Sequence, residues 1–362
     1  MRENVVGTGR RRALLCARPF MLLVVAVLFL GACAGAPPPP SWPGLSATED
    51  TVYAAIGKVY ALDADTGQKR WEFPPEGDKE PPAYFYSTPA VELGLVFAGS
   101  YDKKLYALDA HTGQVRWTFA TGDRIVAGPA VAGDAVYVAS ADRRLYALDA
   151  ATGAKRWEFE TGKWIWATPL VEGNRVYLAS MDHKLYCLDA ESGRKVWEVQ
   201  VEGALAATPA LAEGTVYFGA FDAKVHALDA ATGEQRWEFA TGGWIWGQPL
   251  VVGDTVYVGS LEGKVYALDA HTGQKRWEFA ADGAVRAGPA YGAGLLYVGS
   301  EGGKVYALDA RTGQKRWEFE AEAGVLTAPL MAGEMVYVVA RTGQVYALDA
   351  ATGGGRWIFS AK

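Results

Sequence analysis

The sequence predicts an all-β fold, an eight-bladed β-propeller of four-stranded antiparallel blades. Three observations support this prediction. A repeat of about 40 residues runs to the C-terminus, each copy holds four short strand-like stretches, and tight-turn residues separate these stretches. A four-stranded unit repeated at this period is typical of propeller blades and not of a helical solenoid.

Each copy of the repeat closes with Val-Tyr-Ala-Leu-Asp-Ala-x-Thr-Gly-x-x-Arg-Trp or a close variant. Successive tryptophans are 40 residues apart, except that six extra residues around Pro81 and Pro82 lengthen the first interval to 46. The eight closing residues are Trp71, Trp117, Trp157, Trp197, Trp237, Trp277, Trp317 and Trp357.

One unit shows the four strands that the pattern predicts, at residues 167–171, 175–179, 184–188 and 196–199. These stretches are apolar on both faces, as expected for strands packed between two neighbouring blades. Gly173-Asn174 and its equivalents suit the first hairpin turn, and Asp-Ala-x-Thr-Gly suits the last one. In the last turn the Asp and Thr oxygens accept backbone N–H groups and the Gly takes a positive φ.

The N-terminal segment, residues 1–32, has the organisation of a lipoprotein signal peptide. Five arginines precede an apolar run of eleven residues, which is too short to span a bilayer comfortably. Leu30-Gly31-Ala32-Cys33 resembles the bacterial lipobox, whose cysteine becomes the lipidated N-terminus. We therefore expect a lipid on Cys33, with a plain secretory signal or an uncleaved anchor as the alternatives.

Residues 33–40 are predicted to form a lipidated tether, and residues 41–362 the propeller. Four consecutive prolines in the tether favour a stiff, extended spacer. Ala34 follows the cysteine, and the sorting rule for lipoproteins of bacteria with two membranes then predicts the outer membrane, facing the periplasm. Arg11-Arg12 resembles a twin-arginine motif, so the export route stays open between the general and the twin-arginine pathway.

Composition argues against a general nucleic-acid-binding protein. The formal net charge of −6 becomes −10 once residues 1–32, with five arginines and one glutamate, are removed, and no long basic run remains. Cys16 and Cys33 belong to the export segment, which leaves Cys187 as the only propeller cysteine and no disulfide to form.

The pattern Ala-x-Asp-x-x-Thr-Gly-x-x-x-Trp, repeated over residues 50–362, resembles the pyrroloquinoline-quinone-like repeat family. The resemblance implies that each closing tryptophan docks one blade onto the next. It also implies one of two branches: the quinoprotein dehydrogenases, or the BamB type of lipid-anchored outer-membrane assembly protein, which is non-catalytic.

The dehydrogenase branch implies a quinone, usually a calcium ion held by Glu, Asn and Asp, a catalytic Asp and an adjacent-cysteine disulfide. This sequence departs from that set, because Asn174 is the only asparagine after the export segment and Cys187 is the only unlipidated cysteine. Blades of 40 residues also leave no long loops to enclose a cofactor. We therefore expect no enzyme activity, no cofactor and no metal site.

Comparing the copies with one another separates positions that build the fold from positions free to carry function. The residue four before each conserved proline is apolar and is expected in the core: Phe85, Ile125, Ile165, Leu205, Ile245, Val285 and Val325. Its two neighbours vary, and strand alternation turns them to the opposite side, where they are expected to ring one mouth of the channel. The candidate partner-binding residues among them are Tyr84, Tyr86, Arg124, Trp164, Trp166, Trp244, Trp246 and Arg286.

The loops between second and third strands are expected to add cations to this mouth, namely Lys103, Lys104, Arg143, Arg144, His183 and Lys184. Trp, Tyr and Arg are the usual anchors of binding hot spots. The alternative is that the tryptophans fill a wide channel and the cations are simply solvated.

These observations predict a non-catalytic, membrane-tethered scaffold for protein–protein interaction at the cell envelope. By resemblance its partner is a protein of the outer-membrane assembly machinery. Two alternatives stay open: a pyrroloquinoline-quinone-binding oxidoreductase or sensor, and an envelope polysaccharide-binding protein.

Overall fold

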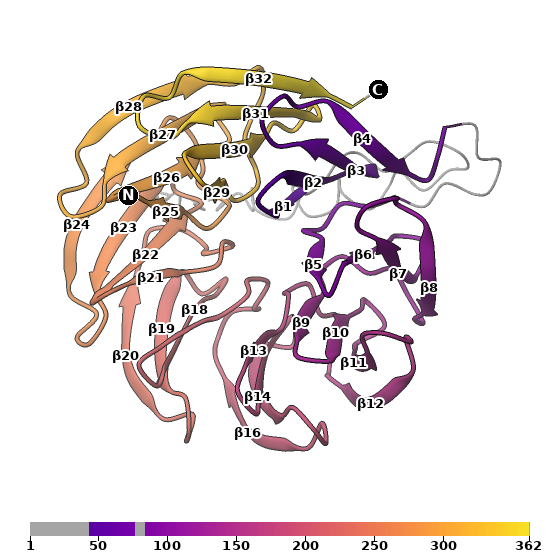
Figure 1. Cartoon of the computed structure of the whole chain (residues 1–362). Coiled ribbons are helices and arrows are strands. Elements are labelled where there is room, and N and C mark those ends of the chain that lie inside the picture. Colours follow the sequence, from indigo (N-terminus) through magenta and orange to yellow (C-terminus); the bar gives the residue numbers. More distant parts are fainter. Residues whose placement is uncertain (1–42, 77–83, 362) are drawn as a thin grey trace, which may run out of the picture. The chain divides into compact units, whose positions relative to one another are not determined.

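The structure is a computed structural model that describes residues 43–76 and 84–361. In these ranges the chain forms 32 strands and no helix, grouped into eight separate four-stranded sheets. The sheets stand in a ring around a central axis (Figure 1), which confirms the predicted eight-bladed β-propeller. The predicted signal peptide, Cys33, the tether and the extra residues around Pro81 and Pro82 lie outside the described residues.

Each blade uses four strands that are consecutive in the chain, so the blades are numbered 1 to 8 in sequence order. Blades 1 to 4 comprise β1 (Gly44–Ala47), β2 (Thr51–Ile56), β3 (Lys58–Asp63) and β4 (Lys69–Phe73); β5 (Ala90–Glu92), β6 (Leu95–Gly99), β7 (Lys104–Asp109) and β8 (Val115–Ala120); β9 (Ala130–Ala132), β10 (Ala135–Ala139), β11 (Arg144–Asp149) and β12 (Lys155–Glu160); and β13 (Leu170–Glu172), β14 (Arg175–Ser180), β15 (Lys184–Asp189) and β16 (Lys195–Gln200).

Blades 5 to 8 comprise β17 (Ala210–Ala212), β18 (Thr215–Gly219), β19 (Lys224–Asp229) and β20 (Gln235–Ala240); β21 (Leu250–Val252), β22 (Thr255–Ser260), β23 (Lys264–Asp269) and β24 (Lys275–Ala280); β25 (Ala290–Gly292), β26 (Leu295–Gly299), β27 (Lys304–Asp309) and β28 (Lys315–Glu320); and β29 (Leu330–Ala332), β30 (Met335–Val339), β31 (Gln344–Asp349) and β32 (Gly355–Ser360).

The two middle strands of a blade carry its core. In blade 4, the four central residues of β15 are buried, whereas β16 alternates between exposed and half-buried residues because its outer edge faces solvent. The register places Cys187 opposite Trp197, and a bulge follows between Cys187 and Leu188. Among the described residues, eight clusters of buried side chains lie between neighbouring blades.

The Asp-Ala-x-Thr-Gly turn joins the third strand to the fourth and also receives the neighbouring blade. Asp109 Oδ1 accepts hydrogen bonds from the backbone N (2.8 Å) and Oγ1 (2.9 Å) of Thr112. Trp71 of blade 1 donates its indole N–H to the carbonyl oxygen of Ala110 at 3.0 Å. Gly113 has a φ of 72°, and a Cβ there would lie 2.7 Å from the Trp71 ring. The turn therefore needs glycine both for its backbone and for the docked ring.

The ring closes by the same side-chain contact and without strand exchange, since every sheet is built from consecutive strands. In blade 8, the indole N–H of Trp357 donates to the carbonyl oxygen of Ala64 in blade 1 at 2.9 Å. The hydroxyl of Tyr337 donates to the same oxygen at 3.3 Å. Trp357 and Ala64, which are 293 residues apart in the sequence, thus form the boundary between blades 8 and 1 that closes the ring.

Candidate functional site

The segment that leads into the first strand of blades 2 to 8 lies against the central axis. Its expected core residue is buried in all seven copies, with an exposed fraction of 1% or less, at Phe85, Ile125, Ile165, Leu205, Ile245, Val285 and Val325. Their burial confirms that this position belongs to the core, although the segment precedes the first strand of its blade and is not itself part of a strand.

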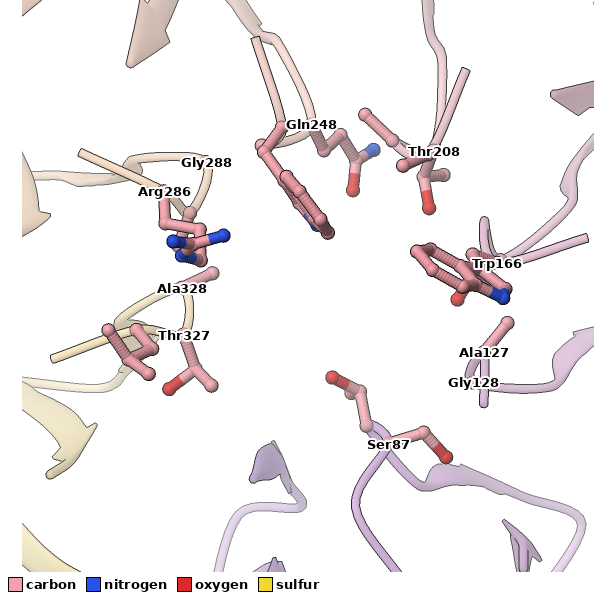
Figure 2. Close-up of a pocket in the computed structure, with 18 of the residues that line it drawn as sticks. Ser87, Ala127, Gly128, Trp166, Thr208, Gln248, Arg286, Gly288, Thr327 and Ala328 are labelled. Carbon is pink, nitrogen blue, oxygen red and sulfur yellow. The ribbon is translucent and has the colours of Figure 1, made fainter. Parts of the chain in front are cut away.

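A cavity of about 200 Å³ lies at the centre of the ring, where these segments converge (Figure 2). Its wall includes the residue three before each conserved proline: Tyr86, Val126, Trp166, Ala206, Trp246, Arg286 and Leu326. The residues directly before the prolines add hydroxyl, amide and small side chains: Ser87, Thr88, Thr168, Thr208, Gln248 and Thr327, with Ala and Gly between them.

The residues five before the prolines form a separate layer. The cavity wall includes Trp166 but, among the described residues, neither Trp164 nor Trp244. Instead, the Trp164 ring stacks on Trp166 with 5.9 Å between centroids, and Tyr84 stacks on Tyr86 at 6.4 Å. Sequence reasoning placed both sets at one mouth, whereas the structure arranges them as an inner wall and an outer layer.

Five rings from three blades meet in what we call the aromatic cluster: Trp164, Trp166, Phe221, Trp244 and Trp246. The Trp166 and Trp246 rings, from blades 4 and 6, lie 6.4 Å apart. Phe221 of blade 5 lies 4.8 Å from both Trp244 and Trp246. The rings meet across blade 5 because that blade contributes only alanines, at 204 and 206, to the channel segment.

A smaller group of rings lies on blade 2 and is joined by Arg124 of blade 3. Tyr86 is 5% exposed and meets the Tyr101 ring edge-on at 5.6 Å, and burial raises the pKa of Tyr86 to about 12. The Arg124 guanidinium lies 5.9 Å from the Tyr101 centroid, within the range of a cation–π contact.

Arg286 belongs to the aromatic cluster's edge and carries a compensated charge. Its guanidinium lies 4.9 Å from the Trp246 ring centroid, and its Nε donates to Glu301 Oε1 at 2.7 Å. The guanidinium is therefore held between the Trp246 ring face and the Glu301 carboxylate. These two contacts fix its position more tightly than that of an arginine side chain without such contacts.

The loop cations expected at the mouth turn elsewhere. Arg143 pairs with Glu160 at 3.1 Å, Arg144 pairs with Glu158, and Lys184 pairs with Glu198 at 2.7 Å, all on the solvent-facing fourth strand of their own blades. Lys103 and His183 instead approach backbone oxygens, those of Gly122 and Glu202, and Lys104 is exposed. Opposite charges on the adjacent fourth strand therefore draw Arg143, Arg144 and Lys184 outward.

Sequence reasoning missed the loop position that does face the channel segments. It is occupied by Tyr101, Ala141, Met181, Phe221, Leu261, Glu301 and Arg341 in successive blades. The backbone N–H of Phe221 donates to the carbonyl oxygen of Ala204 at 3.0 Å, and that of Glu301 to Ala284 at 2.8 Å. Its variation between otherwise similar copies was the signal that could have identified it.

The described residues hold no group of three His, Cys, Asp or Glu side chains placed to bind a metal ion. His226, which replaces a tyrosine, is buried and lies 3.0 Å from Asp222 through its Nε2. Cys187 is buried and free, and burial raises its pKa to about 11, so it is not activated as a nucleophile. In residues 43–76 and 84–361, no helix is long and apolar enough to cross a membrane.

Comparisons with known proteins agree with this architecture. The crystal structure of BamB from Moraxella catarrhalis superimposes with a TM-score of 0.70 at 21% identity, covering 82% of this chain and 93% of that one. A computationally designed protein superimposes with a TM-score of 0.75 at 19% identity, covering 86% and 96%. At these identities the likeness concerns the fold alone. No curated protein matches the sequence.

A family model matches nearly the whole propeller. It is described as outer membrane protein assembly factor BamB, and it matches residues 39–127, 112–204, 182–284 and 261–362. Four overlapping matches cover all eight blades, in keeping with the repeat that the sequence shows. The chain therefore belongs to the family of the outer membrane protein assembly factor BamB.

Proposed function

We propose that this chain is a non-catalytic scaffold of the cell envelope, held at the outer membrane by a lipid on Cys33. Its partner is a protein of the outer-membrane assembly machinery, bound on the periplasmic side. Family membership and the lipobox sequence support this proposal. The partner surface is the outer aromatic layer of the channel mouth.

The observation that carries the proposal is the aromatic cluster. Trp164 is 41% exposed although its ring stacks on Trp166, so one ring face is supported and about two-fifths of the residue is accessible. Rings held rigidly in this way lose little conformational entropy when a partner covers them. Aromatic anchors of this kind dominate the free energy of binding at protein interfaces.

A photo-crosslinking experiment tests the partner surface. The full chain would carry p-benzoylphenylalanine in place of Trp164 or, as the control, in place of Ile358, which is 62% exposed on the outer strand β32. We expect position 164 to crosslink to an outer-membrane assembly protein in intact cells and position 358 not to. Crosslinking of that protein at 358 alone would contradict the proposal.

A substitution gives the energetic measurement. Trp164→Ala is expected to weaken partner binding by about thirtyfold, since truncating a hot-spot aromatic costs about 2 kcal/mol. Val196→Ala is the control, because Val196 is 44% exposed on β16 and lies outside the cluster. Equal partner recovery by both variants would exclude Trp164 from the interface.

The non-catalytic part of the proposal has its own test. Purified protein incubated with pyrroloquinoline quinone and calcium is expected to show neither bound-cofactor absorbance nor dye-linked oxidation of alcohols or sugars. The reason is that the sequence departs from the ligand set of the dehydrogenase branch, with one asparagine and one cysteine in the propeller. Stoichiometric quinone binding would favour the oxidoreductase instead.

A further inference from the structure

The central cavity has two unlike walls. Trp166 and Trp246, from blades 4 and 6, stand on either side of blade 5, whereas Ser87 and Thr327, from blades 2 and 8, stand on either side of blade 1. Since blades 1 and 5 are opposite in a ring of eight, these tryptophans (the aromatic wall) face Ser87 and Thr327 (the hydroxyl wall) across the cavity. Tyr86 also lines the cavity beside Ser87, and Thr168 and Thr208 line it beside the tryptophans. Figure 2 shows Trp166, Ser87 and Thr327 around one open space.

The hydroxyl wall contains buried polar atoms without partners. Ser87 is 7% exposed, and neither its Oγ nor the Oγ1 of Thr327 has a hydrogen-bond partner within the described part of the chain. Leaving a buried hydroxyl unpaired is unfavourable, so native proteins rarely keep one without a reason. Two such groups on one cavity wall indicate an occupant that supplies hydrogen bonds.

Other side chains around the cavity have the same chemistry. Thr88, Thr168, Thr208 and Gln248 add hydroxyl and amide groups from blades 2, 4, 5 and 6. The occupant therefore meets hydrogen-bonding groups on several sides, tryptophan rings at blades 4 and 6, and Tyr86 at blade 2. A purely apolar ligand would leave the Ser87 and Thr327 hydroxyls unpaired.

The cavity offers no uncompensated charge. Arg286 is the only charged residue on its wall among the described residues, and Glu301 holds that guanidinium with oxygen–nitrogen distances of 2.5 and 2.7 Å. A charged ligand would lose hydration without gaining an opposite charge in return. The arrangement favours a neutral ligand.

We propose that this cavity binds one neutral sugar ring. Such a ring carries hydroxyls around its edge and aliphatic C–H groups on its face, which complement the two walls. The C–H face packs on Trp166 and Trp246, and ring hydroxyls pair with Ser87 and Thr327. A volume of about 200 Å³ is below the 300–1,000 Å³ of pockets for drug-sized ligands, so it accommodates a single ring.

Calorimetric titration of the full chain, in a detergent without a sugar headgroup, tests this proposal. The neutral probes are glucose, galactose and N-acetylglucosamine, and the charged comparators are glucuronate and glucosamine. We expect one-to-one binding of at least one neutral sugar and weaker binding of the charged ones. Saturable binding of no neutral sugar, or tighter binding of a charged comparator, would overturn the proposal.

Ser87→Ala separates a ligand hydroxyl from a structural one. We expect it to reduce sugar affinity about tenfold while the melting temperature stays the same or rises, because an unpaired buried hydroxyl is removed. The matched control is Ser140→Ala, since Ser140 is equally buried but its Oγ donates to the Asp123 carbonyl at 3.0 Å. That control should lower the melting temperature and leave sugar affinity unchanged.

The opposite pattern, lower stability and unchanged sugar affinity in Ser87→Ala, would show that the hydroxyl belongs to the fold and would overturn the proposal. Partner binding is a separate readout. Ser87→Ala should retain the protein partner, whereas Trp164→Ala should weaken partner binding about thirtyfold. Failure of the sugar site therefore leaves the scaffold function standing, and the two proposals can fail independently.

Discussion

The docking tryptophan of each blade makes a polar and an apolar contact at the same time. Trp237 is 8% exposed, and its indole N–H donates to the carbonyl oxygen of Ala270 in the next blade at 2.8 Å. The Tyr217 ring lies 5.8 Å away, and its hydroxyl donates to the same oxygen at 3.1 Å. One carbonyl group thus receives two donors from the neighbouring blade.

Trp237→Ala is expected to cost about 3–5 kcal/mol of unfolding free energy, because it removes a buried ring and leaves a cavity at a blade boundary. Thermal unfolding measures the loss as a melting temperature lowered by several degrees or more. Trp237→Phe is the control, since it keeps most of the ring and removes only the N–H donor, at about 1 kcal/mol. Identical melting curves for the alanine variant and the wild type would contradict the docking role.

At the scale of the element, the Asp-Ala-x-Thr-Gly turn determines how closely two blades approach. Gly113 and Gly94 offer a matched comparison, because both have a φ of 72°. A Cβ at Gly113 would lie 2.7 Å from the Trp71 ring, whereas a Cβ at Gly94 meets nothing within 4 Å. The two positions differ only in the docked ring.

Gly94→Ala is expected to cost about 1–2 kcal/mol through its left-handed backbone alone. Gly113→Ala should cost about 1–3 kcal/mol more, because the methyl group overlaps the indole and the blades must separate. Urea unfolding of both variants measures the difference. Equal losses would mean that the turn does not set the blade spacing.

The aspartates of these turns predict acid sensitivity. The pKa is held at about 2 for Asp63, Asp149, Asp229, Asp309 and Asp349. The largest cause is a hydrogen bond from an arginine side chain, and hydrogen bonds from threonine or the backbone lower the pKa further. The pKa values of Asp109, Asp189 and Asp269 are lowered as well. A carboxyl group whose pKa in the folded protein is below the ordinary 3.8 stabilises the fold above pH 3.8. This stabilisation is lost as the pH falls through the pKa of the folded protein.

We therefore expect the melting temperature to fall between about pH 4 and pH 2. Asp309→Asn tests the cause, because Asp309 pairs with Arg316 at 2.7 Å and asparagine lacks the charge. The variant should be less stable than the wild type at pH 7, and the difference should shrink as the pH falls to 2. Added salt should reduce the effect, since the Arg316 side chain is exposed and Asp309 is only half-buried. A difference that is constant with pH would exclude the carboxylate charge as its source.

At the scale of the whole molecule, a ring closed by docked side chains leaves the propeller an independent body. Its chain ends do not exchange strands, and the ring closes through Trp357 and Ala64. The proposed lipid attachment at Cys33 is therefore open to a test separate from those of the propeller.

Cys33→Ser is expected to release the protein from the membrane fraction, because the hydroxyl of serine does not replace the thiol to which the lipid is attached. Cell fractionation and mass spectrometry of the mature N-terminus measure the outcome. Cys187→Ser, at a buried propeller cysteine, is the control and should leave the protein membrane-bound. Retention of the Cys33 variant in the membrane would identify the apolar run as an anchor.

The sequence alone determined the architecture of this protein. The tryptophan period predicted eight blades, the turn pattern predicted where strands end, and an apolar residue four before each conserved proline identified Phe85, Ile125 and their equivalents as core residues. These inferences succeed because each depends on neighbours in the chain and is repeated eight times. The family followed from the same repeats, and the structure and the family match agree with it.

Only the tertiary structure decided which variable residues meet. Phe221 reaches Trp244 and Trp246 because blade 5 has small side chains at the channel, and Glu301 of the β26–β27 loop pairs with Arg286 of the segment before β25 within blade 7. Spacing in the sequence does not report these contacts, since they depend on the rotation between blades and the volume of each side chain. For the same reason the unpaired hydroxyls of the central cavity emerge only once the ring is closed, whereas the ion pairs of Arg143, Arg144 and Lys184 depend on strand pairing within one blade.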